Sequence, residues 1–325
     1  MGLVKTSVII PVYNGEALID RCLRSVFAQV GPLDLEVIVI DDGSTDDSLA
    51  RVKAYGPTLV LLQQDNQGPA AARNRGIASA TGKYISFLDA DDHWNPYFLY
   101  ETIGFMERHP LLVACSAGQC HKFPGKRDMV MPRVLEESPG QFKSAQVLDD
   151  LYGFWYKHNH LCTGSVLMRS DVVKKTKGQR PELRITEDLE FWAYLGTYGS
   201  WGFIPRVLFT SDGAAATKEQ GWVSKNKRRW DSAPTIEQWS QRILGRLPQE
   251  HRASFNKLKG QIARRLTYSM ILSNRIELAR MTTKVHGTNY PSDLLSRLFR
   301  VASPLSVSWR LLAQLINLRE TNRKL

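Results

Sequence analysis

The first 90 residues alternate between short apolar runs and segments with helix-like spacing. Four runs favour β-strands, at residues 7–14, 35–41, 58–62 and 84–88. The intervening segments 17–29 and 69–80 have the character of helices. Strands that alternate with helices along a chain favour a parallel sheet. We therefore predict an α/β fold with a mainly parallel central sheet flanked by helices.

Polar residues follow the apolar runs where each predicted strand ends. Tyr13 follows the first run, Asp42 follows the second, and Asp89 and Asp91 follow the run at 84–88. Ligands of open α/β sheets bind in a crevice beyond the carboxyl ends of the strands. We expect these four side chains to line one crevice.

The segment Asp89-Ala90-Asp91-Asp92 places three carboxylates within four residues. Side chains alternate between the faces of a strand, so Asp89 and Asp91 point the same way. Two such carboxylates repel each other unless a cation lies between them, and oxygen ligands suit Mg²⁺ or Mn²⁺. These ions often take further ligands from a substrate phosphate. The pattern indicates a metal–diphosphate site; the alternative is a solvated acidic turn, and we expect Asp92 to cap the next element of the chain.

Five motifs carry a resemblance to a known family. VIIPVYNGE, VIDDGSTDDS, NQGPAAARNRG, ISFLDADD and TEDLEFW occur in this order within about residues 5–215, roughly two-thirds of the chain. Together they resemble the inverting glycosyltransferases of family 2, which have the GT-A nucleotide-sugar fold. The resemblance implies a Mn²⁺- or Mg²⁺-dependent enzyme that uses a nucleoside-diphosphate sugar, most simply a UDP-sugar. It also implies a glycan or lipid-linked saccharide as the acceptor, within surface-polysaccharide synthesis.

The resemblance assigns roles to individual residues of the nucleotide-sugar site. It makes Asp91 the metal ligand, and Asp89 a ligand of the ribose or of the metal through water. It makes Asp42 the acceptor of a hydrogen bond from the base, although Asp42 also fits a plain turn. Gly68 and Arg73 lie where the family closes over the base. The alternatives are that Gly68 is simply a turn glycine and that Arg73 is a surface helix residue. The full nucleotide-sugar set that the resemblance implies is Pro11, Tyr13, Glu16, Asp42, Gln67, Gly68, Arg73, Asp89 and Ala90.

A general base is also required, because the attacking acceptor hydroxyl must lose a proton. A divalent cation would stabilise the negative charge of the departing diphosphate. The segment TEDLEFW at 186–192 supplies a separate pair of acids, with Thr186 as the expected helix N-cap. We predict Asp188 as the base, with Glu187 as the second candidate. The alternative is that both acids only compensate the helix dipole.

The segment between residues 110 and 184 has a looser pattern. Strands are expected at 113–117 and 164–169, and a polar loop at 123–140. The aromatic and histidine-rich segment 155–160 fits either a sugar-stacking surface or a buried aromatic patch. His121, His158, His160 and Cys162 lack the spacing of a zinc site.

The length of 325 residues predicts one large domain with an appended element. We predict a GT-A catalytic domain over 1–215, with a nucleotide-binding half at 1–110 and an acceptor half at 111–215. A helical basic extension follows at 216–325. The four cysteines form no disulfide framework, no signal peptide is recognisable, and no apolar run approaches the ~20 residues of a membrane span. These features predict a cytoplasmic protein.

The positive charge is concentrated in the C-terminal third. The chain has a net charge of +11, and residues 216–325 hold 21 Lys and Arg against 7 Asp and Glu. This part therefore carries +14 and residues 1–215 carry −3. Basic blocks lie at 225–230 and 264–265, and the segments 294–300 and 309–316 alternate apolar and basic residues.

An anionic partner is expected for this extension. No zinc finger or RNA-binding aromatic signature supports nucleic acid, whereas Lys and Arg near anionic lipid each contribute ~1 kcal/mol. The pattern is that of an interfacial helix at the cytoplasmic face of the inner membrane. The alternative is a helix packed on the protein with a solvated basic face, and no pattern indicates an oligomeric state.

Two other classes of protein share part of this pattern. A non-catalytic nucleotide-sugar-binding module would retain Asp42 but lose the metal or base carboxylates, which this chain has. A haloacid-dehalogenase-type phosphatase carries its two aspartates at the end of the first strand. Here the first strand ends in Pro-Val-Tyr-Asn, which argues against that class.

Overall fold

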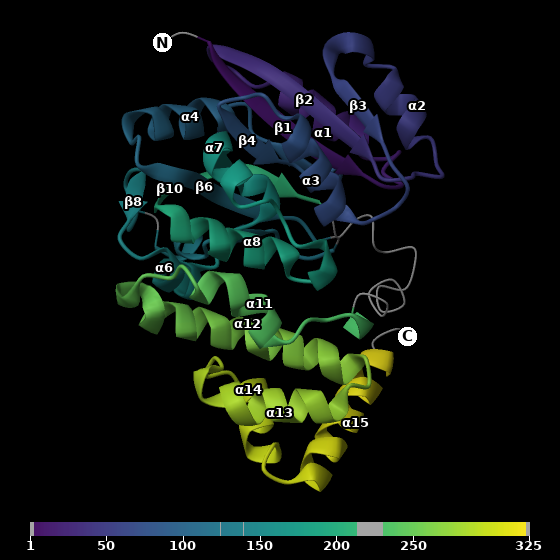
Figure 1. Cartoon of the computed structure of the whole chain (residues 1–325), viewed down its shortest axis with the longest axis vertical. Coiled ribbons are helices and arrows are strands. Elements are labelled where there is room, and N and C mark those ends of the chain that lie inside the picture. The colour runs from purple at the N-terminus through teal and green to yellow at the C-terminus, as the bar shows by residue number, and fades with distance from the viewer. Residues whose placement is uncertain (1–2, 124, 139, 213–229, 323–325) are drawn as a thin grey trace. The chain divides into compact units, whose positions relative to one another are not determined.

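The computed structural model describes residues 3–123, 125–138, 140–212 and 230–322 (Figure 1). It divides into two compact units. The first contains the chain up to residue 181 together with 191–216, and the second contains 182–190 and 217–325. The predicted basic block at 225–230 lies outside the described residues, apart from Trp230. The functional division at residue 215 stays a prediction.

Ten described strands form one mixed sheet in the first unit. They are β1 Val4–Val12, β2 Leu33–Asp41, β3 Val60–Gln63, β4 Tyr84–Phe87, β5 Asp92–Trp94, β6 Leu112–His121, β7 Met129–Met131, β8 Gln146–Leu148, β9 Val166–Arg169 and β10 Ser200–Ser211. Their order is β3-β2-β1-β4-β9-β6-β10-β5, with β7 beside β6 and β8 beside β10.

The predicted α/β fold with a flanked central sheet is confirmed. The first four strands pair in parallel, β3 with β2, β2 with β1 and β1 with β4, and β6 pairs in parallel with β10. The described pairs of β5, β7, β8 and β9 are antiparallel. The parallel strands therefore gather in the predicted nucleotide-binding half, where their carboxyl ends share one edge.

Helices cover both faces of this sheet. In the first unit they are α1 Ile19–Phe27, α2 Ser48–Lys53, α3 Pro69–Ser79, α4 Phe98–Arg108, α5 Val134–Glu137, α6 Leu151–His158 and α7 Ser170–Lys175. Helix α8, Glu187–Leu195, begins in the second unit and ends in the first. The loop expected at 123–140 contains β7 and α5, because residues 119–121 of β6 lie beyond its pairing with β9 and pair with β7 instead.

The apolar run of β1 is continuous because both of its faces are buried. Val8, Ile10 and Val12 join a core with side chains of α1 and α4. Ile9 points to the other face, where α3 packs. A Cβ atom at Gly76 of α3 would lie 2.4 Å from Cγ2 of Ile9, so this helix approaches the sheet closely only with glycine. Burial on both faces is typical of parallel strands.

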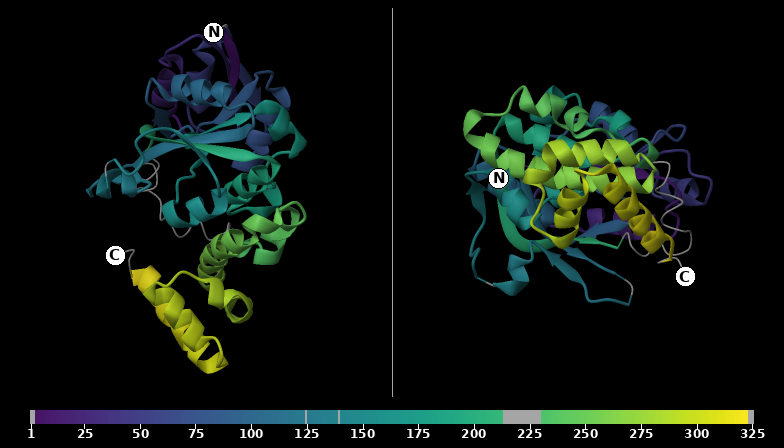
Figure 2. Two further views of the ribbon diagram at one scale, coloured as in Figure 1. Left: turned by 90° about the vertical axis from the view of Figure 1, so that its left-hand side faces the viewer. Right: turned by 90° about the horizontal axis from the view of Figure 1, so that it is seen from below.

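The second unit is helical, as the sequence predicts. Its helices are α11 Ile236–Leu244, α12 Arg252–Leu272, α13 Ile276–His286, α14 Leu294–Ala302 and α15 Ser306–Asn322, coloured green to yellow in Figure 2. The rings of Trp239 and Phe255 stack with centroids 6.1 Å apart. The indole of Trp309 donates to the carbonyl of Ile276 at 2.8 Å. Within the described residues, no helix is both long and apolar enough to cross a bilayer.

Candidate functional site

The loops after β1 and β2 are joined by hydrogen bonds from one to the other. The side-chain oxygen of Asn14 accepts from the backbone N–H of Thr45 at 2.8 Å. The carboxylate of Glu16 accepts from the N–H of Asp47 at 2.9 Å. These contacts fix the predicted nucleotide-binding segment at the carboxyl ends of the two strands. Tyr13 is left 52% exposed, so about half of its surface is open to a partner.

Asp42 holds the loop that leads into α3. One carboxylate oxygen accepts from the N–H of Gln67 at 2.9 Å and from the side-chain amide of Gln64 at 2.8 Å. The other oxygen accepts from the N–H of Gly68 at 2.8 Å. Gly68 has φ +90°, a backbone conformation that favours glycine. The structure thus brings together three residues that the sequence assigned to the nucleotide, and Asp42 is 3% exposed.

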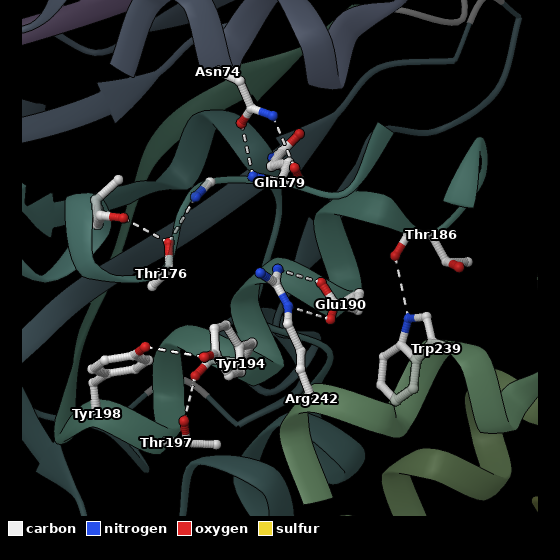
Figure 3. A network of polar contacts seen from close by, with 12 residues as sticks. Asn74, Thr176, Gln179, Thr186, Glu190, Tyr194, Thr197, Tyr198, Trp239 and Arg242 are labelled. Atoms are coloured by element: carbon white, nitrogen blue, oxygen red, sulfur yellow. Dashed lines mark hydrogen bonds and ion pairs between the residues drawn. The ribbon is translucent and has the colours of Figure 1, made fainter. Parts of the chain in front are cut away.

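Arg73 is a buried residue rather than the surface helix residue that the sequence left open. Its side chain is 5% exposed and donates to the carboxylate of Asp89 at 2.5 Å. The guanidinium also lies over the ring of Phe87, 5.9 Å from the centroid, and donates to Gln179 at 3.3 Å. Gln179 is in turn held by two hydrogen bonds to Asn74 of the same helix (Figure 3). Arg73 therefore orients Asp89 from α3.

Asp91 is held through its backbone by Arg21 of α1. One guanidinium nitrogen of Arg21 donates to the carbonyl of Asp91 at 2.7 Å, and the other pairs with the carboxylate of Asp212. Burial and the charge of Asp89 raise the pKa of Asp91 to about 6. Arg21 and Asp212 are site residues that sequence reasoning missed. Asp212 directly follows the strand β10, so an acid at a strand end was a signal that could have identified it, because the strand ends meet at this edge of the sheet.

Asp92 does not cap the next element of the chain, as the sequence had suggested. It is the first residue of β5, is 5% exposed, and has one buried carboxylate oxygen without a hydrogen-bond partner. Burial and the charges of Asp89 and Asp91 raise the pKa of Asp92 to about 8. The pairing of β5 with β10 places Asp92 opposite Ser211, which is why a strand forms here instead of a capped helix.

The residues present fit a divalent cation held partly by substrate. Across the described stretches of the chain, no group of three or more His, Cys, Asp or Glu side chains is arranged to enclose a metal ion. Mg²⁺ and Mn²⁺ do not need such a cage, since one or two carboxylates, water and substrate phosphate complete their shell. Asp89 and Asp91 supply two carboxylates, and Asp92 beside them leaves one buried carboxyl oxygen without a hydrogen-bond partner.

We expect Arg21→Gln to weaken catalysis by about 10–100-fold, the usual cost of losing a group that orients a metal ligand. The change removes the donor to the Asp91 carbonyl and the partner of Asp212. Steady-state kcat/KM measured across a Mn²⁺ series should show a higher Mn²⁺ requirement. Arg24→Gln, on an exposed position of the same helix, is the matched control. Equal loss in both variants would contradict a positioning role for Arg21.

The first turn of α8 is fixed by α11 within the second unit (Figure 3). The guanidinium of Arg242 makes two parallel hydrogen bonds to the carboxylate of Glu190, both 2.6 Å long. Glu190 is completely buried and the side chain of Arg242 is 21% exposed, and the bidentate arrangement makes the pair geometrically specific. The indole of Trp239 donates to the carbonyl of Thr186 at 3.3 Å. The C-terminal extension thus positions the segment that carries the predicted base.

Thr186 does not have the geometry of an ordinary N-cap. Its φ is +62°, whereas N-cap residues are normally extended, and its hydroxyl donates to the carbonyl of Ile185 at 2.5 Å. Glu187 is buried and Asp188 is half-buried in the first turn of the helix. Desolvation lowers the pKa of Arg265 of α12, and the charge of Asp188 acts in the opposite direction. Asp188 therefore has a cationic neighbour in its own unit.

The histidine-rich segment at 155–160 is buried at Trp155 and His160, whereas Lys157 is exposed and the other three residues are half-buried. Trp155 is 2% exposed, and His160 is fully buried against the rings of Phe154 and Phe203. Burial lowers the pKa of His160 to about 3, which keeps its ring neutral. The sequence left open a sugar-stacking surface or a buried aromatic patch with solvated histidines. Packing accounts for Trp155 and for His160, which is buried rather than solvated.

Comparison with known proteins identifies the class to which this fold and site belong. The chain has the GT-A fold. It belongs to the family described as Glycosyl transferase family 2, whose model matches residues 7–176. The resemblance seen in the five motifs is thereby confirmed.

Curated relatives agree with this assignment. YibD of Escherichia coli, a glycosyltransferase by name, is 42% identical over 141 residues, which are 42% of this chain and 40% of that protein. Glycosyltransferase GlyA of Streptococcus pneumoniae is 37% identical over 210 residues, 63% of this chain and 28% of the relative. The poly(ribitol-phosphate) β-N-acetylglucosaminyltransferase TarS of Staphylococcus aureus is 37% identical over 112 residues, 33% of this chain and 20% of that protein. The matches thus span less than half of each of these relatives.

Solved structures share the fold. A structure of S. aureus TarS residues 1–349 in complex with UDP has a TM-score of 0.69 at 19% identity, covering 95% of this chain and 90% of that one. The mannosyltransferase PcManGT from Pyrobaculum calidifontis, in complex with GDP-Man and Mn²⁺, has a TM-score of 0.57 at 17% identity, covering 97% and 87%. At these identities the likeness concerns the fold.

Proposed function

We propose that this chain transfers a sugar from a UDP-sugar to a hydroxyl of a glycan or lipid-linked saccharide, with inversion at the anomeric carbon. The observation that carries the proposal is the pair Asp89 and Asp91 at the end of β4, held in place from α3 and α1 by Arg73 and Arg21. Structural neighbours in complex with UDP and with GDP-Man support a nucleotide sugar as the donor.

The nucleotide would lie along the carboxyl ends of β1 and β2. Tyr13 exposes half of its surface beside the Asp42 loop, so its ring would stack on the base. The carboxylate of Asp42, hydrogen-bonded to the backbone of Gln67 and Gly68, would present polar groups beside the base. Pro11 lies within β1 just before Tyr13, and Glu16 follows it and accepts a hydrogen bond from the loop after β2. Ala90 is buried and would lie against Gly15 of this segment.

The diphosphate would lie near Asp89 and Asp91, which would hold Mn²⁺ or Mg²⁺. When bound, the cation neutralises charge that develops on the departing diphosphate. Asp91 would be the direct ligand, and Asp89, fixed by Arg73, would contact the ribose or a metal-bound water. Arg21 keeps the peptide of Asp91 in place. The substrate phosphates would complete the shell, which suits a site built from few protein ligands.

Asp188 would accept the proton of the acceptor hydroxyl, with Glu187 as the second candidate. In a single displacement the hydroxyl oxygen bonds to the anomeric carbon as the bond to the diphosphate breaks, and the proton passes to the base. The pair of Glu190 with Arg242 holds the turn that carries Asp188. A fixed carboxylate is needed because a general base acts only within hydrogen-bond reach of its proton.

Membership of Glycosyl transferase family 2 argues against a phosphatase. The presence of Asp89, Asp91 and Asp188 argues against a binding module without activity. Peripheral association with the cytoplasmic face of a membrane follows from the proposal that the acceptor is lipid-linked. It is also favoured by the charge of +14 on residues 216–325.

A thermal-shift screen of nucleotides and nucleotide sugars, with and without Mn²⁺, tests the donor. A ligand at 100 times its Kd adds about 2.7 kcal/mol of stability, which raises the melting temperature by several degrees. We expect UDP-sugars to do so only with Mn²⁺, and GDP- and ADP-linked sugars to have much smaller effects. NMR of the product made with the active UDP-sugar then reports the anomeric configuration. Stabilisation by GDP-sugars alone, or retention in the product, would contradict the proposal.

A further inference from the structure

The last two helices expose apolar side chains along one face each. Leu294, Leu298 and Val301 follow one another at intervals of four and three residues on α14 and are 43–80% exposed. The same spacing on α15 aligns four further exposed side chains, Val307, Leu311, Leu315 and Leu318. Positions three and four apart lie on one side of a helix. Each helix therefore presents an apolar stripe to solvent.

These stripes are additional to the ones that hold the helices in the fold. Phe299 of α14 and Trp309 of α15 are buried and pack with ring centroids 5.3 Å apart. Ala313 and Ile316 continue the buried side of α15. The sequence offered two interpretations, an interfacial helix or a packed helix with a solvated basic face. The structure shows packed helices whose solvated face is apolar as well as basic.

The connection between the two helices is apolar too. Pro304, Leu305 and Ser306 are exposed, and Leu305 is 66% exposed between Val301 at 80% and Val307 at 70%. The helices thus form a hairpin, drawn in yellow in Figure 2. Its turn exposes three large apolar side chains, Val301, Leu305 and Val307. We call residues 294–319 the apolar hairpin.

The charges on the apolar hairpin have one sign. Arg297, Arg310 and Arg319 are exposed on the same helices. The two acids of residues 291–320 are both engaged, Asp293 with Arg264 at 3.1 Å and Glu320 with the hydroxyl of Tyr268 at 2.9 Å. The solvent face of the hairpin therefore combines apolar side chains with arginine cations.

We propose that the apolar hairpin docks on an anionic lipid surface, with the side chains of its turn inserted among the acyl chains. Apolar residues with Arg at their margin, and no acid within residues 294–319, match the chemistry of an anionic bilayer interface; the nearest exposed acid, Glu277 of α13, is paired with Arg280. Two copies of the hairpin face to face would instead bring arginine against arginine, and residues 294–319 contribute no carboxylate to pair with them. Neither helix qualifies as a membrane span, so docking on the surface is the mode that fits. This inference does not depend on the identity of the donor or acceptor.

Vesicle co-sedimentation with the full chain tests the proposal. We expect binding to phosphatidylglycerol vesicles at low salt, little binding to phosphatidylcholine vesicles, and weaker binding in about 0.5 M NaCl because of screening. The triple variant V301S/L305S/V307S should bind phosphatidylglycerol about tenfold or more weakly, because affinity scales with the apolar area that is buried. R297Q/R310Q/R319Q should reduce the preference for the anionic lipid. These positions are exposed, so both variants should fold.

The matched control is L3S/V60S/L111S, which removes three exposed apolar side chains of the first unit and should leave vesicle binding unchanged. Deletion of the whole tail is a poor test, because it would strip Phe299 and Trp309 from the core of the bundle. Absence of binding to phosphatidylglycerol at low salt would overturn the proposal, as would equal binding by V301S/L305S/V307S. Light scattering that shows a dimer dissociated by this variant would also overturn it and make the hairpin an interface between copies.

Discussion

Replacing Asp91 with Asn is expected to abolish sugar transfer, with a loss of at least about 10³-fold. The carboxylate is the proposed direct ligand of the cation, and the cation supplies several kcal/mol of charge stabilisation at the leaving diphosphate. The same change should remove the Mn²⁺-dependent part of UDP binding, because the amide is a weaker ligand than the carboxylate. Calorimetric titration of UDP with and without Mn²⁺ measures this directly.

The fold of the Asp91→Asn variant should remain intact. Asp91 lies between Asp89 and Asp92, so removal of one charge relieves repulsion in the protein without metal. We expect an unchanged or higher melting temperature in the absence of Mn²⁺. Asp34→Asn, an exposed acid at the opposite end of β2, is the matched control and should keep full activity. Metal-dependent UDP affinity that is unchanged in Asp91→Asn would remove Asp91 from the metal site.

Replacing Asp188 with Asn is expected to lower turnover by about 10²–10⁴-fold, the usual contribution of a general base. The affinity for UDP and Mn²⁺ should change little, because the proposed donor ligands lie at the ends of β1, β2 and β4. Single-turnover kinetics with saturating donor separates the chemical step from binding. The expected pattern is a lower kcat with a nearly unchanged donor Kd.

Glu187→Gln distinguishes the two acids of this turn. Glu187 is 5% exposed, whereas Asp188 is half-buried and more accessible to a substrate. We therefore expect Glu187→Gln to affect the melting temperature more than Asp188→Asn does. Near-normal turnover in Asp188→Asn, with loss of turnover in Glu187→Gln, would transfer the role of base to Glu187.

Much of the first unit could be predicted because its signals are local. An apolar run that ends in carboxylates marks both a buried parallel strand and the sheet edge where ligands bind. Asp42 and Asp91 were predicted in this way, whereas the loop at Gly68 was implied only by the resemblance to the family. Local patterns specify strand ends well because the topology of a parallel sheet brings those ends to one edge.

Other parts of the site depend on contacts between distant residues. Arg21 and Asp212 are 191 residues apart and form an ion pair next to Asp91. Arg242 and Glu190 are 52 residues apart, and their pair fixes the turn of the proposed base. No periodicity or motif indicates which arginine pairs with which acid. From the sequence alone, a charged residue is predicted to lie on the surface unless its partner is known. Asp92 was misassigned for the same reason, since burial by β10 is a tertiary effect.

The sequence by itself determined the strand–helix alternation, the carboxylates at the strand ends and the helical, basic character of the last third. These properties follow from residue type and spacing, which act over a few neighbouring positions. The tertiary structure decided which charges are paired and which apolar stripe of each C-terminal helix is buried. Both stripes of α15 have helical spacing, and the packing of Trp309 and Ile316 is what leaves Leu311 and Leu315 exposed. Burial depends on what the rest of the chain places against a face, and that information lies outside the helix itself.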